Sequence, residues 1–159
     1  MNAGIVIHTS SGHTLTFARA IEEKLKEKGH QVEILYLRTA GRVTPSGSSN
    51  FSIRNPPQLD EFDVVLVGGP VWAFKASPVI MKFLVEEVKT LKGKKALSFV
   101  TMGLPFKFTG GNRAMRMMNE QLEAAGADVL EGEKLLYMFK TDKEKMYGAA
   151  ERICERLGA

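Results

Sequence analysis

The stretch "GIVIHTSSGHT", residues 4–14, decides how this chain folds. It begins with a continuous, largely β-branched run, which is typical of a strand buried on both faces. It ends where a helical pattern begins, and hydroxyl side chains and Gly12 fill the turn between the two. A strand, a polar turn and a helix in this order form the unit from which parallel α/β sheets are built. The stretch therefore predicts a parallel sheet.

The same alternation continues along the rest of the chain. Strand patterns occur at "QVEILYL" (31–37), "DVVLVGG" (63–69), "KKALSFVT" (94–101) and near "ADVLEGEKLLYMF" (127–139). Helical patterns cover residues 14–28, 78–88, with Ser77 as N-cap, 112–125, and the C-terminal segment, where Thr141 and Glu144 have capping-box spacing. We expect an α/β doubly wound sandwich with a five-stranded parallel sheet and helices on both faces. Gly132 predicts a bulge or break in the last strand.

Residues 39–58 interrupt this alternation. The segment is rich in glycine, proline and serine, and we expect a loop of unusual length. Such long loops in compact domains are usually functional or mobile. Two interpretations stay open: a lid over a bound molecule, formed by Val43, Phe51 and Ile53, or a tolerated surface insertion.

Composition excludes several classes of protein. The 159 residues suit a single domain, 1–159, and 44% hydrophobic with 25% charged residues is ordinary for a globular chain. No apolar run approaches the about 18 residues of a membrane span. The lone cysteine, Cys154, forms no internal disulfide, so we expect a cytoplasmic protein with no membrane association. The net charge of +4 is spread along the chain and does not indicate nucleic-acid binding.

The candidate site lies in the loops that follow the first, third and fourth predicted strands, because doubly wound sheets bind ligands beyond the carboxyl ends of their strands. The turn at residues 9–14 opens a helix, whose unpaired N–H groups and dipole favour an anion such as phosphate. The nucleotide loop G-x-x-x-x-G-K-[ST] and the dinucleotide turn G-x-G-x-x-G are absent. A response regulator would need carboxylates at the strand ends that here carry Thr9, Ser10, Gly68 and Gly69.

Three motifs resemble the flavodoxin family. "TSSGHT" (9–14) matches the phosphate-loop pattern T/S-x-x-G-x-T, "VVLVGGPVWAFKASP" (64–78) is similar to the strand and flavin-flanking loop, and "FVTMG" (99–103) leads to "TGGN" (109–112). The resemblance covers essentially the whole chain and implies strand order 2-1-3-4-5 and FMN as cofactor. Two positions depart from the family: Ile7 replaces an aromatic residue and His13 replaces asparagine.

The resemblance also implies which residues hold the flavin. Its phosphate would be bound by Thr9, Ser10, Ser11, Gly12, His13 and Thr14. The isoalloxazine would lie against Pro70, Val71, Trp72, Ala73 and Phe74, with Trp72 or Phe74 over one face, and its pyrimidine side would be flanked by Thr101, Met102 and Gly103. The alternative for Trp72 is a core position. His13 either adds positive charge near the phosphate or points to solvent, and His8 with His13 suggests a more electropositive site than in a typical flavodoxin.

Charge is distributed unevenly around this site. The three loops at residues 39–58, 70–78 and 101–113 contain no Asp or Glu but carry Arg42, Arg54, Lys75, Lys107 and Arg113. Typical low-potential flavodoxins surround their flavin with acidic residues, and a basic rim has the opposite effect on the reduced cofactor. We expect a higher midpoint potential and an anionic partner or substrate.

Three functions fit these residues. The preferred one is an electron-transfer protein that passes electrons between redox partner proteins, because no segment stands out as a nicotinamide site and no acid/base pair is evident. The second is an FMN-dependent NAD(P)H oxidoreductase of the quinone reductase type, acting on a small acceptor. The third is a non-redox domain that binds a phosphorylated ligand or a partner protein. The exposed aromatic residues of the flavin face are compatible with a homodimer.

Overall fold

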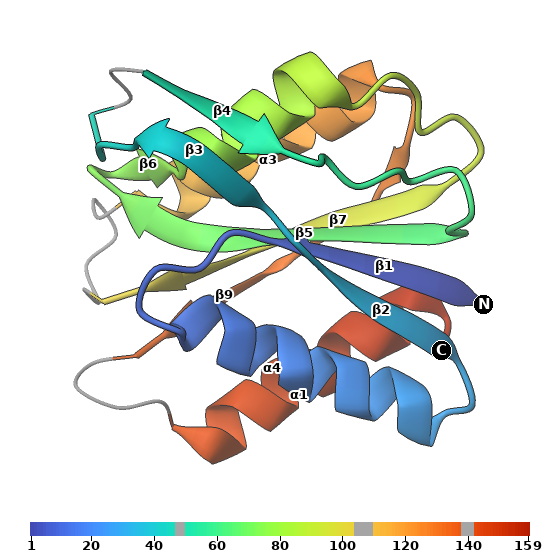
Figure 1. Ribbon diagram of the computed structural model, residues 1–159. Helices are drawn as coiled ribbons and strands as arrows, with labels where there is room; N and C mark the ends of the chain where they lie inside the picture. Colours follow the sequence, from blue (N-terminus) through green and yellow to red (C-terminus); the bar gives the residue numbers. More distant parts are fainter. Residues whose placement is uncertain (47–49, 104–109, 138–141) are drawn as a thin grey trace.

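A parallel sheet runs through the centre of the molecule (Figure 1). The computed structural model describes residues 1–46, 50–103, 110–137 and 142–159. The main strands are β1 (Asn2–Ile7), β2 (Gln31–Tyr36), β5 (Val64–Trp72), β7 (Lys95–Met102), β8 (Asp128–Val129) and β9 (Glu133–Leu136). Their order is β2-β1-β5-β7-β8, with β9 also on β7, and all these pairs are parallel. The predicted order 2-1-3-4-5 and the predicted fold class are confirmed.

Helices cover both faces of this sheet (Figure 1). One face carries α1 (His13–Glu27) and α4 (Lys143–Leu157), and the other carries α2 (Pro78–Lys82), the π-helical segment η1 (Phe83–Glu87) and α3 (Gly111–Ala124). Each face has its own core. Phe17 and Ile153 belong to the core under α1 and α4, whereas Ile80 and Leu122 belong to the core on the opposite face. This two-sided burial explains why the central strands are continuous apolar runs.

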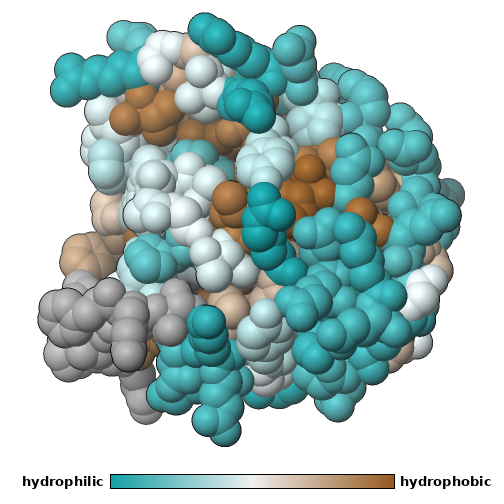
Figure 2. All heavy atoms as spheres, turned by 60° about the horizontal axis from the view of Figure 1, so that its bottom comes forward, coloured by the Kyte–Doolittle hydropathy of each residue, from teal (hydrophilic) through white to brown (hydrophobic). Residues whose placement is uncertain are grey.

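The outer surfaces of α1 and α4 are polar. Figure 2 turns this side forward, and its surface is mostly hydrophilic, with hydrophobic side chains in separate patches. On α1, Lys26 pairs with Glu22 and Lys24 with Glu27. Cys154 of α4 is fully buried, and burial raises the pKa of its thiol to about 11. Within the described residues, every helix is too short or too polar to cross a bilayer.

The helix starts agree with the predicted capping chemistry in part. The Ser77 side chain accepts a 3.2 Å hydrogen bond from the Val79 N–H, and Pro78 occupies the first turn of α2, as predicted. At α4 the N-cap is Asp142, whose carboxylate accepts from the Lys145 N–H at 3.2 Å. This cap lies one residue after Thr141, which is outside the described residues.

Gly132 divides the last strand, as predicted. β8 and β9 both pair with β7, and residues 130–132 between them leave the ladder. A Cβ atom at Gly132 would lie 1.7 Å from the Ser98 carbonyl oxygen, so the backbones approach too closely for any other residue.

The prediction of a structureless loop at residues 39–58 is wrong. β3 (Arg38–Arg42) and β4 (Asn50–Arg54) form an antiparallel hairpin, which connects β2 to β5 without a helix in the described residues. Phe51 is only 8% exposed and packs into the core on the α2 and α3 side, where Val43 and Ile53 flank it. The alternation of Phe51 and Ile53 is a strand signal that the surrounding glycine, proline and serine obscured.

Candidate functional site

The turn at residues 9–12 closes tightly at the carboxyl end of β1. Gly12 has a left-handed backbone, with φ of 90°, and its N–H donates to Thr9 Oγ1 at 3.2 Å. Its carbonyl accepts from the Thr16 N–H at 3.0 Å and from the Thr16 hydroxyl at 2.9 Å, which begins α1. Ser10 and Ser11 are exposed. The turn thus presents a glycine and the exposed hydroxyl groups of Ser10 and Ser11 at the start of a helix.

The N-terminus of α1 fits an anion. It has no side-chain cap and no acidic residue in its first turn. The first N–H groups of a helix have no partner inside the helix and need an acceptor. Among the described residues other than its chain neighbours, nothing lies within 4 Å of the point where a Gly12 Cβ would stand, so these residues leave the space above the turn open. Unpaired donors, a helix dipole and open space together suit a phosphate group.

Thr14 and Thr101 form a buried hydrogen bond at the base of the site. Their hydroxyl oxygens are 2.8 Å apart, and the two residues are 2% and 1% exposed. The bond ties the first turn of α1 to the end of β7. Both residues were predicted to contact the cofactor; the structure pairs their side chains with each other and leaves the backbone N–H of Thr14 in the uncapped first turn.

The second predicted loop is a hairpin. β5 continues to Trp72 and turns back into β6 (Lys75–Ala76), with Trp72 opposite Lys75. The third strand was predicted to end at Gly69 and a loop to follow at residues 70–74, and this is wrong because Pro70, Val71 and Trp72 extend β5. The two-residue turn places Ala73 and Phe74 at φ of 48° and 63°, a conformation that usually requires Asn or Gly. Phe74 is 55% exposed at this strained tip.

The hairpin tip is braced by α3. A Cβ atom at Gly110, the N-cap residue of α3, would lie 2.1 Å from the Phe74 carbonyl oxygen. Only glycine allows this contact, and its φ of 92° also requires glycine. The "TGG" signal found in the sequence thus supports the position of Phe74.

Trp72 faces the site and is absent from both hydrophobic cores of the described residues. Its ring is half-buried and stands edge-on to the His8 ring, with centroids 5.1 Å apart and an interplanar angle of 84°. The alternative of a core position for Trp72 is therefore wrong.

His8 is a neutral residue of the site. Its Nδ1 lies 2.6 Å from Ser77 Oγ, and burial lowers the pKa of its imidazole to about 4. Because Ser77 Oγ already accepts the Val79 N–H, we assign its hydroxyl hydrogen to His8 Nδ1, which places the ring hydrogen on Nε2. The expected contribution of His8 to a positive site is therefore wrong, since burial disfavours the charged imidazole.

His13 packs against a residue that sequence reasoning missed. Its ring stacks on Tyr137 with centroids 3.7 Å apart and an interplanar angle of 12°. Tyr137 directly follows β9, and its N–H donates to the Met102 carbonyl at 3.0 Å. A Cβ atom at Gly103 would lie 3.6 Å from the Tyr137 ring. Tyr137 could have been predicted as a site residue, because the fifth predicted strand ends at the same edge of the sheet as the others.

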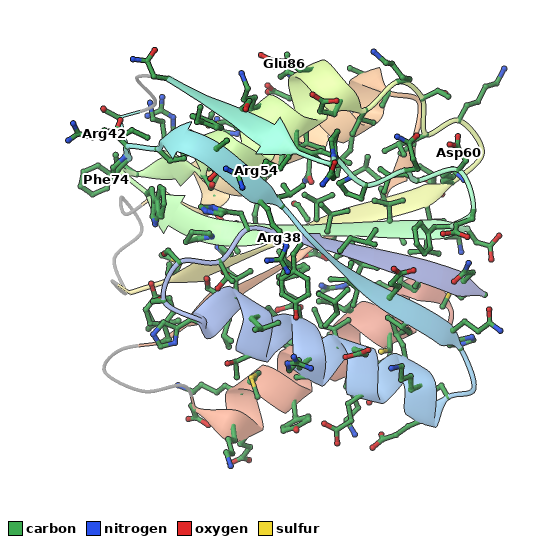
Figure 3. All side chains as sticks on the ribbon, in the orientation of Figure 1. Arg38, Arg42, Arg54, Asp60, Phe74 and Glu86 are labelled. Atoms are coloured by element: carbon green, nitrogen blue, oxygen red, sulfur yellow. The ribbon has the colours of Figure 1, made fainter. Side chains whose placement is uncertain are left out.

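The basic rim is centred on the β3–β4 hairpin. Arg42 and Arg54 are exposed, and Arg54 stands directly opposite Arg38, a residue that the sequence analysis did not include. In Figure 3, Arg42 lies at the same end of the molecule as Phe74, and Arg38 and Arg54 lie nearer the middle. None of these arginines takes part in an ion pair within the described residues. Lys107, also predicted, lies outside them.

Two carboxylates at the start of α4 were not considered when the basic rim was predicted. Asp142 and Glu144 start α4, which follows β9 and so begins at the same edge of the sheet as the candidate site. They lie on the α1 and α4 side, opposite to the hairpin that carries Arg42 (Figure 1). These two carboxylates and the arginines of the hairpin are therefore on opposite faces of the sheet, and Lys143 and Lys145 flank Glu144.

Comparisons with known proteins bear on the fold. No protein-family model matches the chain. A flavodoxin from the domain Archaea is 21% identical, with a TM-score of 0.72 over 100% of both chains. Flavodoxin 1 from Bacillus cereus is 20% identical, with a TM-score of 0.74 over 99% of this chain and 98% of that one.

A third structure is described as a flavoprotein in complex with FMN, from Lactobacillus acidophilus NCFM. It is 17% identical, with a TM-score of 0.64, over 84% of this chain and 92% of that one. These likenesses agree with the strand order and with the helices on both faces. The chain therefore has the flavodoxin-like fold.

Proposed function

We propose that this chain binds FMN, with the phosphate at the N-terminus of α1. The uncapped first turn of α1 carries the proposal, since it combines free donors, a left-handed Gly12 and open space at the carboxyl edge of the sheet. The flavodoxin-like fold supports it, as does the FMN complex of a structural neighbour.

The residues present suit each part of this cofactor. The exposed hydroxyls of Ser10 and Ser11 and the N–H groups of His13 and Thr14 supply donors to the phosphate. Trp72 and the exposed Phe74 supply apolar rings for a flat heterocycle. When bound, FMN supplies one- and two-electron transfer. The protein holds it, shields part of it and sets the charge around it.

Electron transfer between proteins fits the open site better than turnover of a small substrate. The three hydrophobic residues that could have formed a lid over a small substrate are part of the fold instead. Phe51 is buried in the core, and Val43 and Ile53 pack against that core. The exposed Phe74 leaves the rim open to a partner surface. We therefore place the chain among electron carriers, working in the cytoplasm as its lone, buried cysteine suggests.

The partner is anionic. Arg38 and Arg54 oppose each other across the hairpin, and like charges in this position destabilise an antiparallel pair. An acidic partner offsets this repulsion when it docks. Positive surroundings also favour negative charge on the reduced cofactor, so we expect a midpoint potential above that of acidic flavodoxins.

Two measurements test the function. Apo-protein titrated with FMN should quench its fluorescence at a ratio near one to one, and absence of binding at micromolar concentrations contradicts the proposal. The loaded protein should then show little steady-state NADPH oxidation with a quinone acceptor; rapid turnover would favour the reductase instead.

A small oxidant of known charge tests the partner. Reduced, loaded protein should be oxidised faster by ferricyanide at low salt than at high salt, since positive charge attracts this anion. The salt effect should shrink in an Arg38→Gln/Arg54→Gln variant. An unchanged salt dependence would remove the hairpin from the docking surface.

A further inference from the structure

A cavity of about 270 Å³ lies apart from the candidate flavin site. It is open to solvent on one side and is formed by elements from four parts of the chain: β4, β6, the segment α2 to η1, and α3. None of the residues predicted to hold the flavin lines it. Its β4 wall belongs to the hairpin that connects β2 to β5, so the cavity depends on the element that the sequence did not predict.

The interior of this cavity is apolar and adaptable. Phe51 is 8% exposed and contributes the small part of its side chain that the core leaves uncovered, and Met81 and Met117 line the space from α2 and α3. Methionine side chains are flexible and polarizable, and they pack well against aromatic ligands. These three residues suit a flat, apolar group.

Two lysines give the cavity its charge. Glu86 lies 3.1 Å from Lys82 Nζ, which also stands 5.3 Å from the centroid of the Phe51 ring. Lys75 is half-buried and forms no ion pair within the described residues. In Figure 3, Glu86 lies at the outer side of the helical layer. One lysine is thus paired and one is left, so the lining carries a net single positive charge.

We propose that this cavity binds a small aromatic monocarboxylate, with the carboxylate on Lys75 and the ring against Phe51, Met81 and Met117. The volume lies just below the about 300–1,000 Å³ of pockets for drug-sized ligands, which suits one or two fused rings. A charge-assisted bond to a half-buried lysine favours the anion over a neutral isostere. None of the residues assigned to FMN lines the cavity, although Lys75 stands opposite Trp72 in the β5–β6 hairpin.

Methyl NMR tests this binding with 2-naphthoate as the probe. The protein is labelled with [methyl-¹³C]methionine, and the signals of Met81 and Met117 are assigned from Met81→Leu and Met117→Leu variants. Among the eight methionines, 2-naphthoate should shift mainly these two signals. The neutral 2-naphthamide should bind about tenfold more weakly.

A pair of lysine variants isolates the charge. Lys75→Gln should abolish the preference for the acid, whereas Lys92→Gln, an exposed residue outside the cavity, should retain it. The unshifted methionine signals show whether each variant is folded. Equal binding of acid and amide, shifts dominated by other methionines, or no shift at millimolar probe would each overturn the proposal. Because the experiment uses protein without FMN, it tests the cavity even if the chain does not bind FMN.

Discussion

Helices α1 and α4 lie side by side, yet they begin in opposite ways. Each has 15 residues, and they contact each other through a Tyr147 to Glu23 hydrogen bond and a Lys28 to Glu151 ion pair. Both follow a strand of the central sheet and start at its carboxyl edge (Figure 1). α4 starts with a capping aspartate and has Glu144 in its first turn, whereas α1 starts with a glycine and has no acidic residue in its first turn.

The comparison indicates that the start of α4 serves the stability of its own helix, whereas the start of α1 is suited to binding the proposed ligand. At α4 the Asp142 carboxylate accepts one of the free N–H groups, that of Lys145, and Glu144 matches the helix dipole. At α1 the same groups are left for a ligand. Because glycine is itself a tolerated N-cap residue, a side-chain cap would stabilise α1 by only a few tenths of a kcal/mol, so leaving these N–H groups free costs the fold little.

The largest expected effect comes from Gly12. Gly12→Val should weaken FMN binding by at least about a hundredfold, because a β-branched residue cannot adopt the left-handed turn and its side chain fills the open space. FMN fluorescence titration measures this loss.

Gly29→Val is the matched control. Gly29 stands at the other end of α1, also has a left-handed backbone, with φ of 84°, and also faces open space. It should destabilise the protein similarly in thermal denaturation but retain FMN binding. Equal loss of binding in both variants would show that Gly12 matters only for folding.

The second prediction concerns a carboxylate placed next to the start of α1, where α4 has Asp142. Ser11 is exposed and directly precedes the Gly12 cap, so Ser11→Asp should fold normally. Its carboxylate should repel the phosphate and weaken FMN binding about tenfold, an effect that salt reduces. Ser11→Asn, similar in shape and neutral, should bind FMN like the parent. An unchanged affinity in Ser11→Asp would place the phosphate elsewhere.

The third prediction concerns the pH dependence of stability. His8 of the candidate site is hydrogen-bonded to Ser77, the N-cap residue of α2. The folded pKa of His8, about 4, lies below the unfolded value of 6.5, so the unfolded chain binds more protons between these values. Stability should therefore be complete above pH 6.5 and decline as the pH falls toward 4.

Urea denaturation at several pH values measures this decline. His8→Asn retains a side chain that can bond Ser77 and should flatten the curve between pH 6.5 and 4. If the variant keeps the slope of the parent, another group causes the acid sensitivity.

The smallest effect is expected at α4. Asp142→Ala removes the side-chain cap and should lower the free energy of unfolding by about 1 kcal/mol. FMN affinity should not change, since Asp142 serves its own helix. Chemical denaturation and FMN titration measure the two quantities. A loss of affinity would mean that α4 also contributes to the site.

Local chemistry made much of this fold predictable. The continuous run in β5 and the pair of Ser77 and Pro78 each act within a few residues of sequence, and the structure confirms both. The break at Gly132 is also confirmed, although the contact that requires glycine there comes from Ser98 of β7. The turn at residues 9–12, the candidate phosphate site, could be recognised for the same reason, since a glycine among hydroxyl residues before a helix is a local pattern.

Contacts between distant segments were not predictable in this way. The pairing of β3 with β4 depends on burying Phe51 in a core made by other elements. The low pKa of His8 depends on its burial near Ser77, and the ring stacked on His13 comes from Tyr137, far along the chain. Each of these needs the tertiary structure, because the sequence around the residue does not contain its partner.

Comparing FMN with riboflavin tests the central claim most directly, since the two differ only in the phosphate. Fluorescence titration of the apo-protein should give an affinity for FMN at least about a hundredfold higher than for riboflavin, because only FMN reaches the free N–H groups of α1. Inorganic phosphate should compete with FMN and not with riboflavin. Equal affinities for the two flavins would contradict the assignment of α1 as the phosphate site.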